Sequence, residues 1–226
     1  MKSKAFTLAE TLITLGVIGI VAALTLPAII QKQHKKELET AFTKSYASLQ
    51  NAIMSLSPDT YASLSGNVAG ASTVFFDDLF SKYKIVNSKN VTLKYYNNKT
   101  RKWQIKTYLK KDGSYNQCAG LPTKIIADGS AIGASYNCFT NWIILDTNGP
   151  HKKPNALGHD LFYFGFTDKG KLIPLGKEYY HWEMNGNSNF CSKDSTHAQN
   201  GASCTYFAVI NQCPHDPEKT YWECLP

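Results

Sequence analysis

The chain has 226 residues, of which 43% are hydrophobic and 18% charged, so it has enough apolar side chains for a core and is not globally disordered. Its formal net charge of +7 is compatible with binding to nucleic acid or anionic lipid, but the sequence contains no long run of like charges. Solvated surface lysines are therefore the simplest interpretation of this charge.

The first predicted element is an apolar helix. Thr11 to Ile30 contains twenty residues without a charge, which is about the length that crosses the hydrocarbon core of a membrane. A cleavable signal peptide has a shorter apolar stretch, of about 7–15 residues, and ends in small residues at its cleavage site. Here Glu10 stands at the head of the apolar run, and no such ending precedes Pro27. A generic signal anchor also leaves this acid unexplained.

The residues from Ala5 to Glu10, Ala-Phe-Thr-Leu-Ala-Glu, followed by an apolar helix, resemble the processing site of type IV prepilins and type II secretion pseudopilins. The resemblance implies that a dedicated membrane peptidase cleaves between Ala5 and Phe6 and that Phe6 is then N-methylated. Ala5 stands where the family usually has Gly. Glu10 and Pro27 take the family's positions for the assembly acid and for the proline of the membrane helix.

A carboxylate within a bilayer costs about 2.5–3.5 kcal/mol, so Glu10 is expected to have a function. Cleavage would create an ammonium group at Phe6, and pairing with Glu10 of a neighbouring subunit would neutralise two buried charges. The alternative is that the Glu10 carboxylate reaches the lipid headgroups. Pro27 removes one helix hydrogen bond and is expected to kink or loosen the helix, although proline also occurs in ordinary membrane helices.

Periodicity extends the helix beyond the membrane. Apolar residues recur at intervals of three, four and seven, as an amphipathic helix requires, at Leu38, Ala41, Phe42, Leu49, Ile53 and Leu56. We therefore expect a leader at 1–5, a transmembrane and assembly helix at 6–30, an amphipathic continuation at 31–57 and a globular extracytoplasmic domain at 58–226.

The second half of the chain holds six cysteines and no C-x-x-C pair: Cys118, Cys138, Cys191, Cys204, Cys213 and Cys224. The even count favours disulfides in an oxidising compartment. Proximity favours the pairs Cys118–Cys138, Cys191–Cys204 and Cys213–Cys224. Zinc is the competing interpretation, but Cys213-Pro214-His215 is too short a spacing for a usual zinc site.

The lysines on the two sides of the apolar run nearly balance, with Lys2 and Lys4 before it and Lys32, Lys35 and Lys36 after it. The cysteines decide the orientation, because disulfides place the C-terminal domain on the oxidising side. We therefore expect a single-pass protein of the bacterial inner membrane whose later location is a pilus or a periplasmic pseudopilus.

After Ser57-Pro58, which should end the helix, the chain is expected to be irregular to residue 90, with a short helix around 75–83. Strand patterns follow at 91–96, 103–109, 124–127, 130–133, 142–145, 161–166 and 171–175, and the region beyond Tyr179 is expected to be loop-like. The predicted fold class is α+β and pilin-like: a long N-terminal helix packed on an antiparallel sheet, with a disulfide-bonded C-terminal region.

Asp and Asn alternate before Gly at Asp146-Thr147-Asn148-Gly149, a pattern typical of calcium loops, but no glutamate follows as in an EF-hand. Some secretion pseudopilins bind calcium in this domain, so the resemblance implies Asp146, Asn148 and Asp160 as ligands. The alternative is a hydrogen-bonded Asx turn. No other cofactor is expected.

The sequence contains no nucleophile elbow, zinc-protease helix, P-loop or dinucleotide-binding glycine run, so we do not expect an enzyme. Aromatic residues beside lysines, at Tyr95, Tyr96, Trp103 and Tyr108, suit DNA binding, but a half-buried sheet gives the same alternation.

The predicted function is a structural subunit of a type II secretion pseudopilus or a type IV pilus. Its implied partners are identical or related pilin subunits, the prepilin peptidase and methylase, the inner-membrane assembly platform and membrane lipid. The alternative is a minor pilin that acts as a tip adhesin or DNA-binding module. A membrane-anchored extracytoplasmic enzyme is a third hypothesis.

Overall fold

The computed structural model describes residues 7–57, 59–60, 69–86, 95–97, 102–106, 112–114, 123–135, 142–166, 171–176, 190–197 and 200–225. The chain divides into two units, residues 1–37 and 38–226. Helix α1 (Leu8–Met54) contributes residues to both units and continues through Pro27, so this proline does not end the helix.

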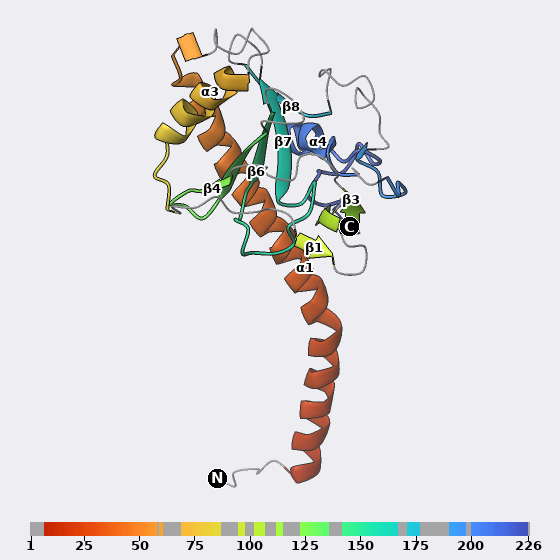
Figure 1. Cartoon of the computed structure of the whole chain (residues 1–226). Helices are drawn as coiled ribbons and strands as arrows, with labels where there is room; N and C mark the ends of the chain where they lie inside the picture. The colour runs from red at the N-terminus through yellow and green to blue at the C-terminus, as the bar shows by residue number, and fades with distance from the viewer. Residues whose placement is uncertain are drawn as a thin grey trace. The chain divides into compact units, whose positions relative to one another are not determined.

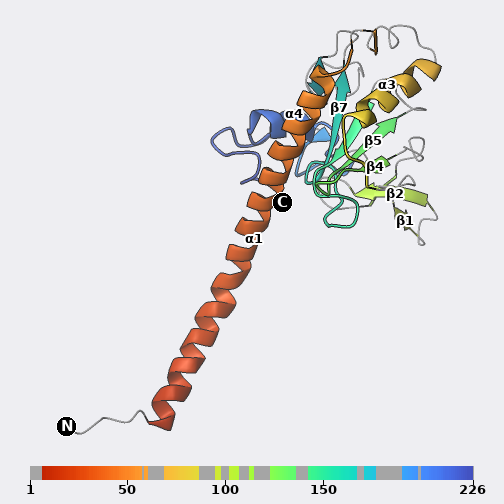
Figure 2. The same cartoon turned by 90° about the vertical axis from the view of Figure 1, so that its left-hand side faces the viewer.

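The C-terminal half of α1 buries one face in the second unit. The residues of this face are spaced by three, four or seven positions: Leu38, Phe42, Ser45, Leu49, Ala52 and Ile53. Phe42 contacts Phe162 with 4.5 Å between ring centroids, and Tyr46 stacks on Phe164 at 5.4 Å. This part of α1 lies along a β-sheet in both views (Figures 1 and 2).

That sheet has five antiparallel strands in sequence order: β4 (Thr123–Ile125), β5 (Ala131–Ser135), β6 (Trp142–Asp146), β7 (Leu161–Phe166) and β8 (Leu172–Pro174). The predicted strands at 124–127, 130–133, 142–145, 161–166 and 171–175 correspond to these five. Asp128 and Gly129 form the turn between β4 and β5, where Gly129 has a φ of 92° and the Asp128 side chain accepts the Ser130 N–H.

Both faces of the central strands are buried, because alternate side chains enter two different clusters. Ile143 and Leu145 of β6 join the cluster that contains the buried face of α1. Trp142 and Ile144 join a second cluster with Leu157 and other apolar residues. The apolar run of β6 therefore reflects burial on both sides of the sheet.

Helix α3 (Ala69–Ser81) begins earlier than the sequence predicts. Phe75, Phe76 and Leu79 are fully buried in the same hydrophobic cluster as the buried face of α1, called the main cluster below. This burial anchors the C-terminal part of α3. Thr60 donates a hydrogen bond of 2.8 Å to Asp78, so the segment after α1 is tied to α3.

A separate sheet contains three short antiparallel strands, β1 (Tyr95–Asn97), β2 (Lys102–Lys106) and β3 (Asp112–Ser114). The pattern at 91–96 and 103–109 predicts β1 and β2, although residues 91–94 and 107–109 lie outside the described residues. Strand β3 is not predicted, because its sequence Asp-Gly-Ser is typical of a turn.

The loop-like prediction beyond Tyr179 is wrong at α4 (Cys204–Ile210). Asn211 caps the end of this helix in a left-handed conformation with a φ of 51°, and its N–H donates to the Ala208 and Phe207 carbonyls. With the long N-terminal helix, the antiparallel sheet and the C-terminal disulfides, the fold is α+β and pilin-like.

Candidate functional site

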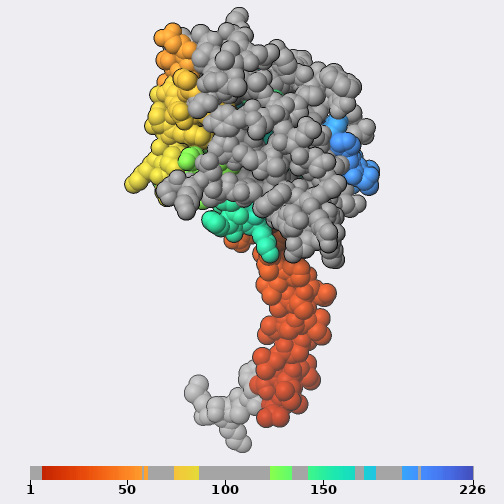
Figure 3. Space-filling view, in the orientation of Figure 1, coloured from red at the N-terminus to blue at the C-terminus, as the bar shows by residue number. Residues whose placement is uncertain are grey.

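The N-terminal half of α1 is an exposed apolar surface. Its large hydrophobic side chains are between 53% and 79% exposed, and they are Leu8, Leu12, Ile13, Leu15, Val17, Ile18, Ile20, Val21, Leu24, Leu26, Ile29 and Ile30. Figure 3 shows these residues (red) at the surface. The helix is long and apolar enough to cross a membrane, and no part of its most apolar window is buried by the described residues.

Glu10 is the only charged residue between Leu8 and Gln31, and it belongs to a capping box at the start of α1. The Thr7 N–H and the Thr7 hydroxyl each donate a hydrogen bond of 2.8 Å to Glu10 Oε2. In return, the Glu10 N–H donates to Thr7 Oγ1 at 3.2 Å.

The capping role of Glu10 is not among the sequence predictions, although the signature Thr-x-x-Glu before an apolar run indicates it. The capping box fixes the carboxylate at the helix N-terminus, where the helix dipole favours a negative charge. Ala5 and Phe6, the two residues of the predicted cleavage site, lie outside the described residues.

The three residues predicted as calcium ligands come together beside the ends of β6 and β7. Asp146 ends β6 and pairs in register with Leu161, the residue after Asp160. Both acids are fully buried, and the Asn148 amide, which donates to the Lys153 carbonyl at 3.3 Å, lies near enough to Asp160 to lower the pKa of that carboxyl. The acidic loop, defined here as residues 146–160, therefore places two acids and one amide in a single cluster.

Much of the acidic loop is the predicted Asx turn. Asp146 Oδ1 accepts hydrogen bonds from the Gly149 N–H at 2.8 Å and the Asn148 N–H at 3.3 Å. The Asp160 carboxylate accepts the Asn155 and Ala156 N–H groups, each at 2.7 Å. These bonds between side chains and backbone organise the loop.

Three other side-chain oxygen atoms of the acidic loop have no hydrogen-bond partner among the described residues. Within the described part of the chain, Asp146 Oδ2, Thr147 Oγ1 and Asn148 Oδ1 are buried without a hydrogen-bond partner. Burial, followed by the charge of Asp160, raises the pKa of Asp146 to about 8. Burial also raises the pKa of Asp160 to about 6, against the opposing effect of its backbone hydrogen bonds. Two buried acids beside unsatisfied oxygen atoms cost folding free energy at neutral pH.

This donor set fits a calcium ion. Calcium prefers carboxylate, amide and carbonyl oxygens, and a divalent cation would offset the two carboxylate charges. Asp146, Asn148 and Asp160 would hold the ion, and Thr147 adds an unsatisfied hydroxyl beside them.

Two contacts fix the acidic loop against the rest of the domain. Ser45 of α1 donates a hydrogen bond of 3.4 Å to the Thr147 carbonyl. Gly149 lies so close to the β4–β5 turn that an added Cβ would be 2.1 Å from the Gly129 carbonyl oxygen. The loop is therefore packed between α1 and that turn.

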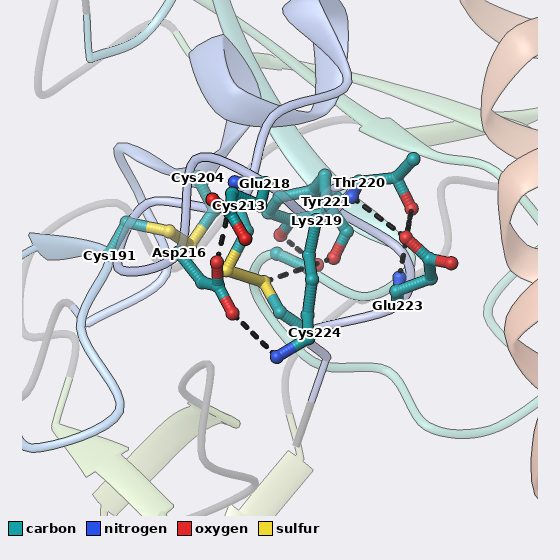
Figure 4. Close-up of a disulfide and its surroundings, with 11 residues drawn as sticks. Cys191, Cys204, Cys213, Asp216, Glu218, Lys219, Thr220, Tyr221, Glu223 and Cys224 are labelled. Carbon is teal, nitrogen blue, oxygen red and sulfur yellow. Dashed lines mark hydrogen bonds and ion pairs between the residues drawn. A yellow bond between two sulfur atoms is a disulfide. The ribbon is translucent and has the colours of Figure 1, made fainter.

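Two disulfides hold the C-terminal region, Cys191–Cys204 and Cys213–Cys224, and both are drawn in Figure 4. They are the pairs that proximity along the chain favours. Cys118 and Cys138 lie outside the described residues. Because Cys213 and Cys224 are bonded to each other, they are not available as thiolate ligands for zinc.

The aromatic residues considered for DNA binding are placed only in part. Tyr96 is the register partner of Trp103 on neighbouring strands, and Tyr95 pairs with Gln104. Tyr108 lies outside the described residues. Neither their side chains nor a nucleic-acid interface is described.

Comparisons with protein-family models, curated proteins and solved structures found no match to this chain.

Proposed function

We propose that this chain is a prepilin-like structural subunit, cleaved between Ala5 and Phe6 and polymerised through α1 into a type II secretion pseudopilus or a type IV pilus. The observation that carries the proposal is the difference between the two halves of α1. One half buries a single face in its own domain, whereas the other exposes apolar side chains over all of its surface with Glu10 as its one charge.

Exposed apolar surface of this extent requires lipid or other helices around it. The uncharged run of twenty residues is about 30 Å long at 1.5 Å per residue, which matches the hydrocarbon core. The disulfides favour an oxidising compartment for the C-terminal domain. We therefore assign the precursor to the bacterial inner membrane, with one membrane-spanning helix and an extracytoplasmic domain.

The capping box supports a specific role for Glu10 in assembly. Both hydrogen bonds that the carboxylate accepts from Thr7 end at Oε2. In the proposed filament, Oε1 accepts the N-terminal ammonium of Phe6 from a neighbouring subunit. Thr7 then holds the acid in position while the neighbour supplies the neutralising charge.

The test separates charge from helix capping. Glu10→Gln keeps the size of the side chain and its ability to cap Thr7, but removes the charge. This variant should insert into the membrane normally and be lost from sheared filaments or from intersubunit crosslinks. Thr7→Ala is the comparison variant, because it removes the hydroxyl that shares the capping box with Glu10 and keeps the charge, so it should assemble less well than the wild type but better than Glu10→Gln. Normal incorporation of Glu10→Gln would refute the charge-pairing role.

We also propose that the chain is the substrate of the prepilin peptidase and methylase and is not itself an enzyme. Its further partners are identical or related pilin subunits and the inner-membrane assembly platform. A minor pilin at the filament tip is the alternative, and it differs in copy number. A few copies per filament, with ligand binding by the assembled tip, would favour that alternative.

A second proposed property is calcium binding by the acidic loop, and the observation that favours it is the buried, unpartnered Asp146 Oδ2. Calcium would supply positive charge that stabilises the folded domain. Adding calcium to the full chain in detergent should raise the unfolding temperature more than adding magnesium, which prefers smaller and more hydrated sites. Asp160→Asn should weaken this response, and an unchanged unfolding temperature with calcium would contradict the assignment.

A further inference from the structure

The two described disulfides have different surroundings. Cys191 and Cys204 are 1% and 0% exposed and belong to the main hydrophobic cluster. Cys213 is also buried, but its partner Cys224 is only half-buried. Cys224 is therefore the most exposed of the four described cysteines, and an attacking thiolate would approach it more readily than the buried three.

His215 lies beside this accessible disulfide. One of its ring nitrogens and the sulfur atoms of Cys213 and Cys224 all lie within 4.8 Å of one another, and the imidazole itself is exposed. Asp216, the next residue, forms an ion pair with Lys219 (Figure 4). An exposed imidazole at this distance is placed to exchange protons with thiols that attack or leave the disulfide.

Partial burial favours the neutral imidazole of His215. Burial, followed by the charge of Lys193, lowers its pKa, while Asp194 and Asp216 act in the opposite direction. At pH 7 the ring is therefore mainly neutral and able to accept a proton.

We propose that Cys213–Cys224 is a thiol–disulfide exchange site in which His215 carries the proton from the attacking thiol to the leaving thiolate. An incoming thiol gives its proton to His215, and its sulfur attacks Cys224 Sγ. The bond between Cys224 and Cys213 breaks, a mixed disulfide forms on Cys224, and the Cys213 thiolate takes the proton from His215. A second thiol then releases the Cys224 thiol, so two external thiols become one disulfide while the protein disulfide gains two electrons.

Exchange at this site affects the packing of the chain end. The loop closed by Cys213–Cys224 carries Tyr221 and Trp222. The Trp222 ring lies 5.5 Å from that of Phe42 and 6.1 Å from that of Phe162, and the Tyr221 hydroxyl donates to the Gly158 carbonyl. Opening the disulfide therefore releases a constraint on the segment that packs against α1, while Cys191–Cys204 continues to hold the region before it.

The experiment treats the oxidised full chain, in detergent at pH 7, with reduced glutathione in one arm and a thioredoxin in the other. Aliquots are quenched with acid and alkylated, and each cysteine is quantified by peptide mass spectrometry. Cys213 and Cys224 should be labelled about tenfold faster than Cys191 and Cys204, because the buried pair must wait for local opening. The faster arm identifies whether a small thiol or a dithiol protein is the better source of the thiolate.

His215→Asn tests the proton transfer, with His151→Asn as the matched control on an exposed histidine outside this segment. The wild type and the control should show an inflection below pH 6.5 in the exchange rate of Cys213–Cys224, corrected for the thiolate fraction of the reagent, and His215→Asn should lack it. Equal labelling of both disulfides in both arms would overturn the exchange site. Unequal labelling with an unchanged profile in His215→Asn would overturn the role of the imidazole.

Discussion

The indole ring of Trp222 lies against the phenyl ring of Phe42, with 5.5 Å between their centroids, and joins the end of the chain to helix α1. Phe162 of β7 contacts both rings, at 4.5 Å from Phe42 and 6.1 Å from Trp222. Helix, sheet and C-terminal segment therefore meet in one aromatic cluster.

Replacing Phe42 with Ala should destabilise the domain strongly, because the side chain is 3% exposed and the cavity would open among three elements. The expected loss in free energy of unfolding is about 3–5 kcal/mol. Urea unfolding in detergent, followed by near-ultraviolet circular dichroism, measures it. Thr43→Ala is the control on the exposed side of α1 and should change stability by less than about 0.5 kcal/mol. Similar losses in the two variants would show that the cluster does not hold the domain on α1.

Gly149 and Gly129 offer a matched pair of substitutions. Both have a positive φ, of 88° and 92°, so Ala at either position strains the backbone by about 1–2 kcal/mol. Only at Gly149 would the new Cβ also meet backbone, at 2.1 Å from the Gly129 oxygen. The unfolding temperature of Gly149→Ala should therefore fall well below that of Gly129→Ala. Equal values would mean that the acidic loop does not pack on the β4–β5 turn.

The buried acids predict how stability depends on pH in calcium-free buffer. The pKa of Asp146 is about 8 in the folded chain, against an ordinary value of 3.8, so between these values the folded state binds more protons than the unfolded state. The contribution of Asp146 to stability is therefore full below pH 4 and is lost as the pH rises through 8.

Urea midpoints with a calcium chelator should accordingly fall between pH 5 and pH 8.5, and Asp146→Asn should fall less because it has no charge to bury. The difference between the two proteins should reach a few kcal/mol. Parallel pH profiles would contradict the raised pKa of this carboxyl.

Local sequence patterns are sufficient to predict most of the fold. The apolar spacing of α1, the Asp128-Gly129 turn and the apolar run of β6 each have one local solution, because period and turn chemistry agree. The pairs Cys191–Cys204 and Cys213–Cys224, separated by 13 and 11 residues, are those that pairing cysteines in chain order gives. Helix α4 could not be predicted, because seven mostly apolar residues show no period that separates helix from strand.

The candidate sites depend more on tertiary structure. The sequence identifies Asp146, Asn148 and Asp160 by type, but only the folded chain shows that both acids are buried and that Asp146 Oδ2 has no partner among the described residues. The proximity of His215 to the Cys213–Cys224 disulfide also depends on chain closure, which a local pattern does not encode. The capping box of Glu10 is different, because its Thr-x-x-Glu signature is local and can be recognised in the sequence.

The most direct test of the central proposal is the mass of the N-terminal peptide of the protein purified from its native membrane or filament. We predict a chain that begins with N-methylated Phe6 and lacks residues 1–5. A chain that retains Met1, or one that begins near residue 28 as after an ordinary signal peptide, would contradict the proposal.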